Sequence, residues 1–309
     1  MAKSTRLSDE YGYARFPLAK AFRRLIDGDV PAGHAELSRD AVKAYSAYLF
    51  SIDGEMSYLR AQAYASVLAS MDASQKAVLD AMKGQGAADW QQPATEPAAL
   101  KNHGAYSVQL RTYAGEMFAW HVGSVDADVY FCPEREGTYF GSFFMKDIKA
   151  MHSPDYTIDS NMAAEMGDAF PAALDSTQKA KITGLVTEQN QDLLNIVAKR
   201  AEISKLLRNF LQQGSVDEAT VVGLAEEYGE LDGEISYYYA TRFSEVGKTL
   251  SANQKTTLTA LRKKATVEDD GSADYDDLCG NGYLYSAPLQ SPPTVMNTDF
   301  MFGVCASGG

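Results

Sequence analysis

The feature that most constrains the fold of this chain is an internal repeat. Residues 52–82 align without a gap with residues 231–261, which read IDGEMSYLRAQAYASVLASMDASQKAVLDAM and LDGEISYYYATRFSEVGKTLSANQKTTLTAL. A second match pairs residues 18–28 with residues 203–213. Self-similarity of this kind is the signature of a duplicated structural unit, so we expect two copies of one fold.

The long segment of each copy has the apolar spacing of an amphipathic helix. The apolar positions are Val42, Tyr45, Leu49, Ile52, Met56 and Leu59 in the first copy, and Val221, Leu224, Tyr228, Leu231, Ile235 and Tyr238 in the second. A row of small residues lies on roughly the opposite side, at Ala47, Gly54 and Ala61, with matching Gly233 and Ala240. Small residues let two helices approach closely. The sequence therefore predicts an all-α fold of duplicated long antiparallel hairpins, packed on each other as an internal pseudo-dimer.

Three related stretches predict helix starts: MDASQK at 71–76, LDSTQK at 174–179 and LSANQK at 250–255. In each, a capping residue is followed three positions later by Gln, whose side chain can reach back to the backbone N–H of the cap. The six predicted capping residues are Asp72, Gln75, Asp175, Gln178, Ser251 and Gln254.

These motifs, placed at both ends of a long antiparallel hairpin, resemble the LTxxQ motif of the Spy/CpxP family. Residues 174–265 are similar to a whole unit of that family and residues 14–83 to most of one. The resemblance implies an all-helical periplasmic or secreted protein that binds a protein or small ligand in a curved cradle. Some members act as ATP-independent chaperones, and related ones sense metals. The fusion of two units would replace the family's homodimer by an internal pseudo-dimer.

We expect four regions. Residues 1–83 form the first helical unit, which lacks the opening segment of the second, and residues 161–268 form the second unit. Between them lies an insert, residues 84–160, in which residues 99–123 read as a helix and residues 129–147 as short strands. Residues 269–309 form an irregular tail that weakly echoes the insert.

Charge and hydropathy limit the partners. The chain has 28 Lys and Arg against 41 Asp and Glu, a formal net charge of -13, which repels nucleic acid at long range. No apolar run approaches the roughly 20 residues that span a bilayer. We expect neither a nucleic-acid partner nor a membrane span.

A cluster of soft ligands in the insert supports an alternative function. Met117, His121, Cys132 and His152 could bind copper or zinc, and Met117 and His121 share a helical face. A packed core would use the same Met and aromatic residues. The alternative is a metal-binding protein or oxidoreductase with its site in residues 117–152.

The repeated carboxylates are a further candidate site. Asp53, Glu55, Asp232 and Glu234 would approach one another across a pseudo-two-fold axis and could hold a metal, or they could form ion pairs, for instance with Arg60 or Arg242. The repeat also places Tyr58 and Tyr237 near the junction. We take Glu55, Tyr58, Glu234 and Tyr237 as candidates for a ligand site or interface. No Ser-His-Asp, P-loop or dinucleotide motif is evident, so a non-catalytic protein is favoured.

The chain has three cysteines. If it works outside the cytoplasm, we expect a disulfide between Cys279 and Cys305, with Cys132–Cys279 as the rival pairing. Three free thiols would favour a cytoplasmic location instead.

Overall fold

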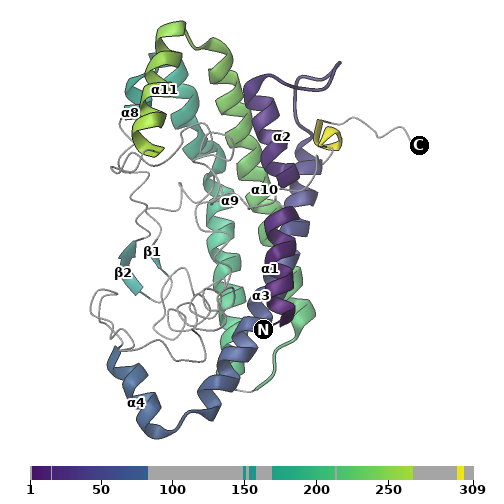
Figure 1. The fold of residues 1–309 in the computed structure, drawn as a ribbon, viewed down its shortest axis with the longest axis vertical. Helices are drawn as coiled ribbons and strands as arrows, with labels where there is room; N and C mark the ends of the chain where they lie inside the picture. Colours follow the sequence, from purple (N-terminus) through teal and green to yellow (C-terminus); the bar gives the residue numbers. More distant parts are fainter. Residues whose placement is uncertain are drawn as a thin grey trace, which may run out of the picture.

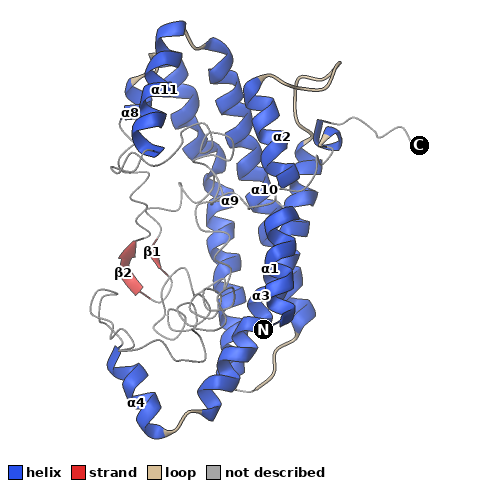
Figure 2. Ribbon diagram, in the orientation of Figure 1, coloured by secondary structure: helices blue, strands red, loops and turns tan. Residues whose placement is uncertain are grey.

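The computed structural model describes residues 2–14, 16–82, 149–150, 153–157, 169–212, 214–266 and 298–302. These residues are mostly helical, which confirms the predicted all-α class (Figure 2). Among them, β1 (Lys149–Ala150) and β2 (Ser153–Thr157) form one small antiparallel pair with an irregular register. Residues 99–123 and 129–147, predicted as a helix and as strands, lie outside the described part.

Long helices dominate the structure and run along its longest axis (Figure 1). They are α1 (Ala2–Ala14), α2 (Phe16–Asp27), α3 (Arg39–Ser70), α9 (Ser176–Arg208) and α10 (Glu218–Thr249). The largest interface joins α3 and α10, and α9 packs along α10. The α1 helix packs on α3, whereas α2 packs mainly on α10. None of the described helices combines the length and apolar character needed to cross a membrane.

The shorter elements sit at the ends of these helices. A 3₁₀ turn, η4 (Asn209–Leu211), continues α9. The α4 helix (Ala73–Met82) and the α11 helix (Ala252–Thr266) lie at opposite ends of the longest axis (Figure 1). A short helix, α8 (Ala169–Ala172), contacts α11, and η5 (Asp299–Phe302) packs on α2 and α3.

The helix bounds follow the sequence repeat. Adding 179 to the bounds of α3 gives those of α10, and the same separation relates the first residues of α4 and α11. The side chain of Ser38 accepts a hydrogen bond from the Ala41 amide to start α3, and Asp217 caps α10 in the same way through Thr220. Equivalent positions of the two copies therefore start and stop the same helices.

Glycines set the contact between α3 and α10. A Cβ atom built on Gly54 would lie 2.6 Å from the Cβ of Ala225, and one on Gly233 would lie 2.8 Å from the Cβ of Ser46. Gly229 has the least room to adjust, since its Cβ would lie 2.7 Å from the carbonyl oxygen of Ser46 and 2.8 Å from the Cα of Ala47, which are both backbone atoms. The two helices are thus closer here than any larger residue would allow.

These contacts are reciprocal under the repeat. Gly54 faces Ala225, Val222 and the Val221 carbonyl, and Gly233 faces Ser46, Lys43 and the Val42 carbonyl, which are the counterparts of those residues. In an isologous, two-fold interface, a contact between residues i and j is accompanied by a contact between their counterparts. The contacts of Gly54 and Gly233 have this pattern. Gly229 and its counterpart Phe50 face each other, so the centre of this pattern lies between them.

The apolar core repeats as well. One cluster consists of Ala61, Tyr64, Ile203, Leu207, Phe210, Val221, Leu224 and Ala225. Their counterparts Ala240, Phe243, Leu18, Phe22, Leu25, Val42 and Tyr45 belong to or pack on the larger cluster, and the counterpart of Ala225 is the buried Ser46. In both places the end of one unit's first helix packs against the long helices of both units.

We predict that Gly229→Ala destabilises the protein by about 1–3 kcal/mol, because the added methyl group meets the backbone of α3. Gly223→Ala is the matched control on the same helix. A Cβ there meets nothing within 4 Å, and replacing this partly exposed helical glycine by alanine should add about 0.5–1 kcal/mol of stability. Urea denaturation measures both. Equal stabilities would show that α3 and α10 do not meet at this glycine.

Leucine at Gly54 or Gly233 should be at least as damaging, since each site faces the other helix within 3 Å. Thermal unfolding of the two variants should show similar losses, because the sites are counterparts. Two variants as stable as the parent would mean that these faces are exposed.

Candidate functional site

All three predicted capping motifs form reciprocal hydrogen bonds at helix starts. The Asp72 amide donates to Gln75 Oε1 at 2.9 Å, and the Gln75 amide donates to Asp72 Oδ1 at 2.9 Å. The same pair of bonds joins Asp175 with Gln178 at 3.0 and 2.9 Å, and Ser251 with Gln254 at 2.9 and 3.2 Å. The hydrogen bonds that the Ser74 hydroxyl and the Gln75 amide donate to Asp72 favour its charged form and lower its pKa.

Two of these glutamines also join three helices. Gln254 Nε2 donates to Gln178 Oε1 at 2.6 Å and to the Ala173 carbonyl at 3.1 Å. Gln178 Nε2 donates to the Thr249 carbonyl at 3.2 Å, and the Gln178 side chain is almost fully buried. The pair therefore fastens the start of α9 to the end of α10 and the start of α11. A signal for this contact is present in the sequence, since both motifs fall at the same end of one predicted hairpin.

The candidate carboxylates are buried or ion-paired. Glu234 accepts hydrogen bonds from Arg39 and from Lys43 Nζ, the latter at 2.7 Å, and Tyr238 adds a third donor at 3.2 Å. Glu55 pairs with Lys3 of α1. Asp53 and Asp232 are buried inside the protein. Within the described ranges, no group of three or more His, Cys, Asp and Glu side chains is placed to hold a metal ion.

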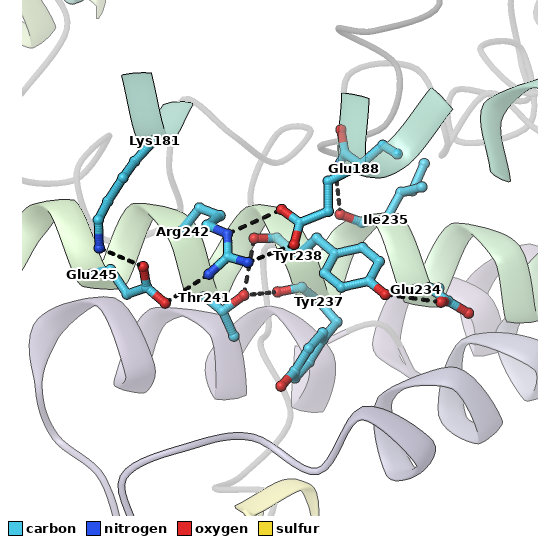
Figure 3. A network of polar contacts seen from close by, with 10 residues as sticks. Lys181, Glu188, Glu234, Ile235, Tyr237, Tyr238, Thr241, Arg242 and Glu245 are labelled. Atoms are coloured by element: carbon cyan, nitrogen blue, oxygen red, sulfur yellow. Dashed lines mark hydrogen bonds and ion pairs between the residues drawn. The ribbon is translucent and has the colours of Figure 1, made fainter. Parts of the chain in front are cut away.

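Arg242 of α10 takes part in a network of polar contacts with α9 (Figure 3). Its guanidinium donates to Glu188 at 2.5 and 3.0 Å and to Glu245 at 2.8 Å, and Lys181 donates to Glu245 at 2.8 Å. The hydrogen bond from Lys181 and the charge of Arg242 hold the pKa of Glu245 below its usual value. These ion pairs hold α9 against α10. Arg242, a predicted partner of the repeated carboxylates, instead pairs with Glu188 and Glu245.

The two candidate tyrosines have different surroundings. Tyr58 of α3 packs edge-on against Phe210 of η4, with ring centroids 5.2 Å apart, so it joins the first copy to the second. Tyr237 packs edge-on against Tyr238 at 5.8 Å, and partial burial raises the pKa of its hydroxyl. Tyr58 therefore contacts η4 through Phe210, which also lines the groove described below.

An open groove of about 350 Å³ lies where α3, α4 and η4 meet. It is lined by Ala65, Leu68, Ala69, Lys76, Asp80, Phe210 and Leu211. Leu211 is 40% exposed although it is a large apolar residue. Its lining residues come from α3 and α4 on one side and from η4 on the other. The sequence pattern does not mark Phe210 and Leu211 as site residues, because they fall at the end of a predicted helix.

The remaining candidates lie outside the described residues. They are the metal-ligand set Met117, His121, Cys132 and His152, and the cysteines Cys279 and Cys305. A copper or zinc site and either disulfide pairing therefore stay predictions.

Comparison with known proteins yields no relative from which a function can be taken. No family model, curated protein or solved structure matches the chain.

The glutamine pair leads to a testable prediction. Gln254→Ala removes the side-chain cap bond to Ser251 and the contacts with Gln178 and Ala173, whereas Gln75→Ala removes only the side-chain cap bond to Asp72 at α4. We expect Gln75→Ala to cost about 1 kcal/mol and Gln254→Ala to cost more. Urea denaturation of the Gln178→Ala and Gln254→Ala variants and of the double variant gives their coupling. Independent effects would mean that the two amides do not meet.

A second prediction concerns Asp192, whose pKa is raised by burial despite nearby Lys43 and Arg39. The folded state then holds the proton more tightly than the unfolded chain. The contribution of Asp192 to stability is therefore fully present below its ordinary pKa in the unfolded chain. That contribution is lost as pH rises through the raised pKa of the folded state. Asp192→Asn should therefore stabilise the protein at pH 7 and have little effect near pH 3.

The matched control is Glu245→Gln. Because the folded-state pKa of Glu245 is lowered, its contribution is present at neutral pH and is lost as pH falls. This variant should be destabilised at pH 7 and similar to the parent in acid. Thermal unfolding across pH measures both, and parallel curves for the two variants would contradict the assignment.

Proposed function

We propose that this chain is a non-catalytic binding protein of the Spy/CpxP type, in which two fused hairpin units form an internal pseudo-dimer that binds segments of other proteins. The reciprocal contacts at Gly54 and Gly233 carry this proposal. They are what a two-fold dimer of hairpin units would make if its subunits were joined in one chain. The three capping boxes add support, since they lie at the positions of the LTxxQ-like motifs.

The groove between α3, α4 and η4 is the binding site that we favour. Its floor is made of alanine, leucine and phenylalanine side chains, and its charged lining residues are one lysine and one aspartate. A small-molecule site usually adds several convergent polar groups that fix the orientation of its ligand. An open apolar groove of this size instead suits one or two apolar side chains of a protein segment.

The acidity of the chain suggests which proteins it binds. With a formal net charge of -13, its long-range field attracts basic partners and repels acidic ones. We therefore propose that it binds exposed apolar segments of basic proteins. Such an activity fits a periplasmic or secreted protein, a location that rests on the family resemblance alone.

The test is suppression of aggregation of reduced lysozyme, a basic protein, as it is diluted from denaturant. We expect the parent to suppress aggregation, and Leu211→Glu to abolish most of this effect by placing a charge in the groove. Val186→Glu is the matched control, because Val186 is also an exposed apolar residue but lies at the far end of α9. Equal activity of all three proteins would rule out the groove, and an inactive parent would rule out the proposal.

A further inference from the structure

We propose that the corner between α2 and α3 is a binding site for short peptide segments in which an acidic residue precedes apolar and aromatic residues. The chain's own η5 segment, residues 298–302, occupies this corner as an intramolecular ligand. We call the corner the η5 site and define it by Arg24, Ser38 and Tyr45.

The η5 site recognises its ligand through charge, backbone and ring contacts. Arg24 Nη1 donates to Asp299 Oδ1 at 2.7 Å and to Thr298 Oγ1 at 3.1 Å. The same guanidinium lies over the ring of Phe302, 5.3 Å from its centroid. Arg24 thus contacts both the acidic residue, Asp299, and the aromatic residue three positions later, Phe302.

Two further contacts fix the register of the segment. The Ser38 amide, at the start of α3, donates to the Met301 carbonyl. The ring of Tyr45 packs on Phe300 with centroids 5.7 Å apart. Each residue from Thr298 to Phe302 therefore has a defined partner or is buried.

Burial shows which residues anchor the segment. Met301 and Phe302 are at most 2% exposed, whereas Phe300 is 40% exposed. Two neighbouring apolar side chains thus enter the core, and the acidic residue stays at the rim beside Arg24. A short peptide with the same order of residues could make all of these contacts.

The contact is small for a permanent one. Stable interfaces between separate proteins use about 20–30 residues on each side, whereas this segment has five. Attachment to the same chain compensates by supplying an effective concentration on the order of millimolar. Another protein that offers such a segment, or offers it more than once, can therefore compete for the site.

Comparison of the two units shows that the site is not simply a requirement of the fold. At the repeat positions of Arg24 and Tyr45 the second unit has Asn209 and Leu224, which cannot make the charged and ring contacts. At the buried positions beside them both units stay apolar, with Phe22 matched by Leu207. The residues that make the charged and ring contacts with η5 are therefore found in the first unit and not at the matching positions of the second.

The experiment uses full-length chains and a labelled peptide of residues 296–304, MNTDFMFGV, with fluorescence anisotropy as the readout. In the Asp299→Lys chain, repulsion from Arg24 should release the chain's own segment. We expect this chain to bind the peptide at least tenfold more tightly than the parent does. A peptide carrying Asp299→Lys should not bind it.

Charge reversal gives the second arm. The Arg24→Glu chain should bind the Asp299→Lys peptide and reject the parent peptide. Lys20→Glu, an exposed charge reversal one turn earlier on α2, should behave like the parent chain. Concentration-dependent dimers of the parent that the peptide dissociates would identify a second copy of the chain as a competing ligand, in support of the site.

Two results would overturn the inference. One is a folded Asp299→Lys chain and a folded Arg24→Glu chain that bind neither peptide more tightly than the parent. The other is unfolding of both chains, which would make η5 a fixed part of the core. This inference extends the proposed binding function to a second site, yet it is independent of the groove: Leu211 lines the groove and not the η5 site, so Leu211→Glu should leave peptide binding here unchanged.

Discussion

The rest of the structure depends on the close approach of α3 and α10 at three glycines. The backbone at Gly229 lies against Ser46 and Ala47. On either side of this contact, Gly54 and Gly233 each lie against the opposite helix. At this separation the larger residues around the glycines can interlock, as Phe50 does with Tyr228 at 4.6 Å between ring centroids. The outer helices α1, α2 and α9 then pack onto a central pair whose geometry is already set.

The two copies differ in the contacts that surround the interface between α3 and α10. Glu234 is held by Arg39 and Lys43 of α3, whereas its counterpart Glu55 is held by Lys3 of α1. The glutamine pair fastens the α11 end, and the groove opens at the α4 end. If the two units serve as a scaffold, as we propose, the places where they differ are where binding specificity can arise.

Much of the fold could be predicted because local sequence patterns determine where its helices form. The three-four spacing of apolar residues predicted the long helices, and the capping residues Asp72, Asp175 and Ser251 predicted where three helices begin. The small-residue row also pointed to Gly54 and Gly233, which lie between α3 and α10. Gly229 escaped notice, since its counterpart is Phe50 and no small-residue repeat connects them.

The sites were harder to predict because their residues meet only after folding. Arg39 and Glu234 are nearly 200 positions apart, and nothing local links their charges. Arg24 and Asp299 come from opposite ends of the chain. The groove likewise needs Phe210 and Leu211 beside the end of α3. A repeat can suggest that two copies pack together, but it cannot say which unrepeated residues they bring into contact.

The central claim is that the two units are related by a pseudo-two-fold axis between α3 and α10, and spin-label distances test it most directly. Under that symmetry, the distance from residue 48 to residue 248 equals the distance from residue 69 to residue 227, since 48 matches 227 and 69 matches 248. All four side chains are exposed, and the native cysteines would first be replaced by serine. We predict that double electron–electron resonance gives the same distance for both pairs. Distances that differ by more than one helical turn, about 5 Å, would contradict the claim.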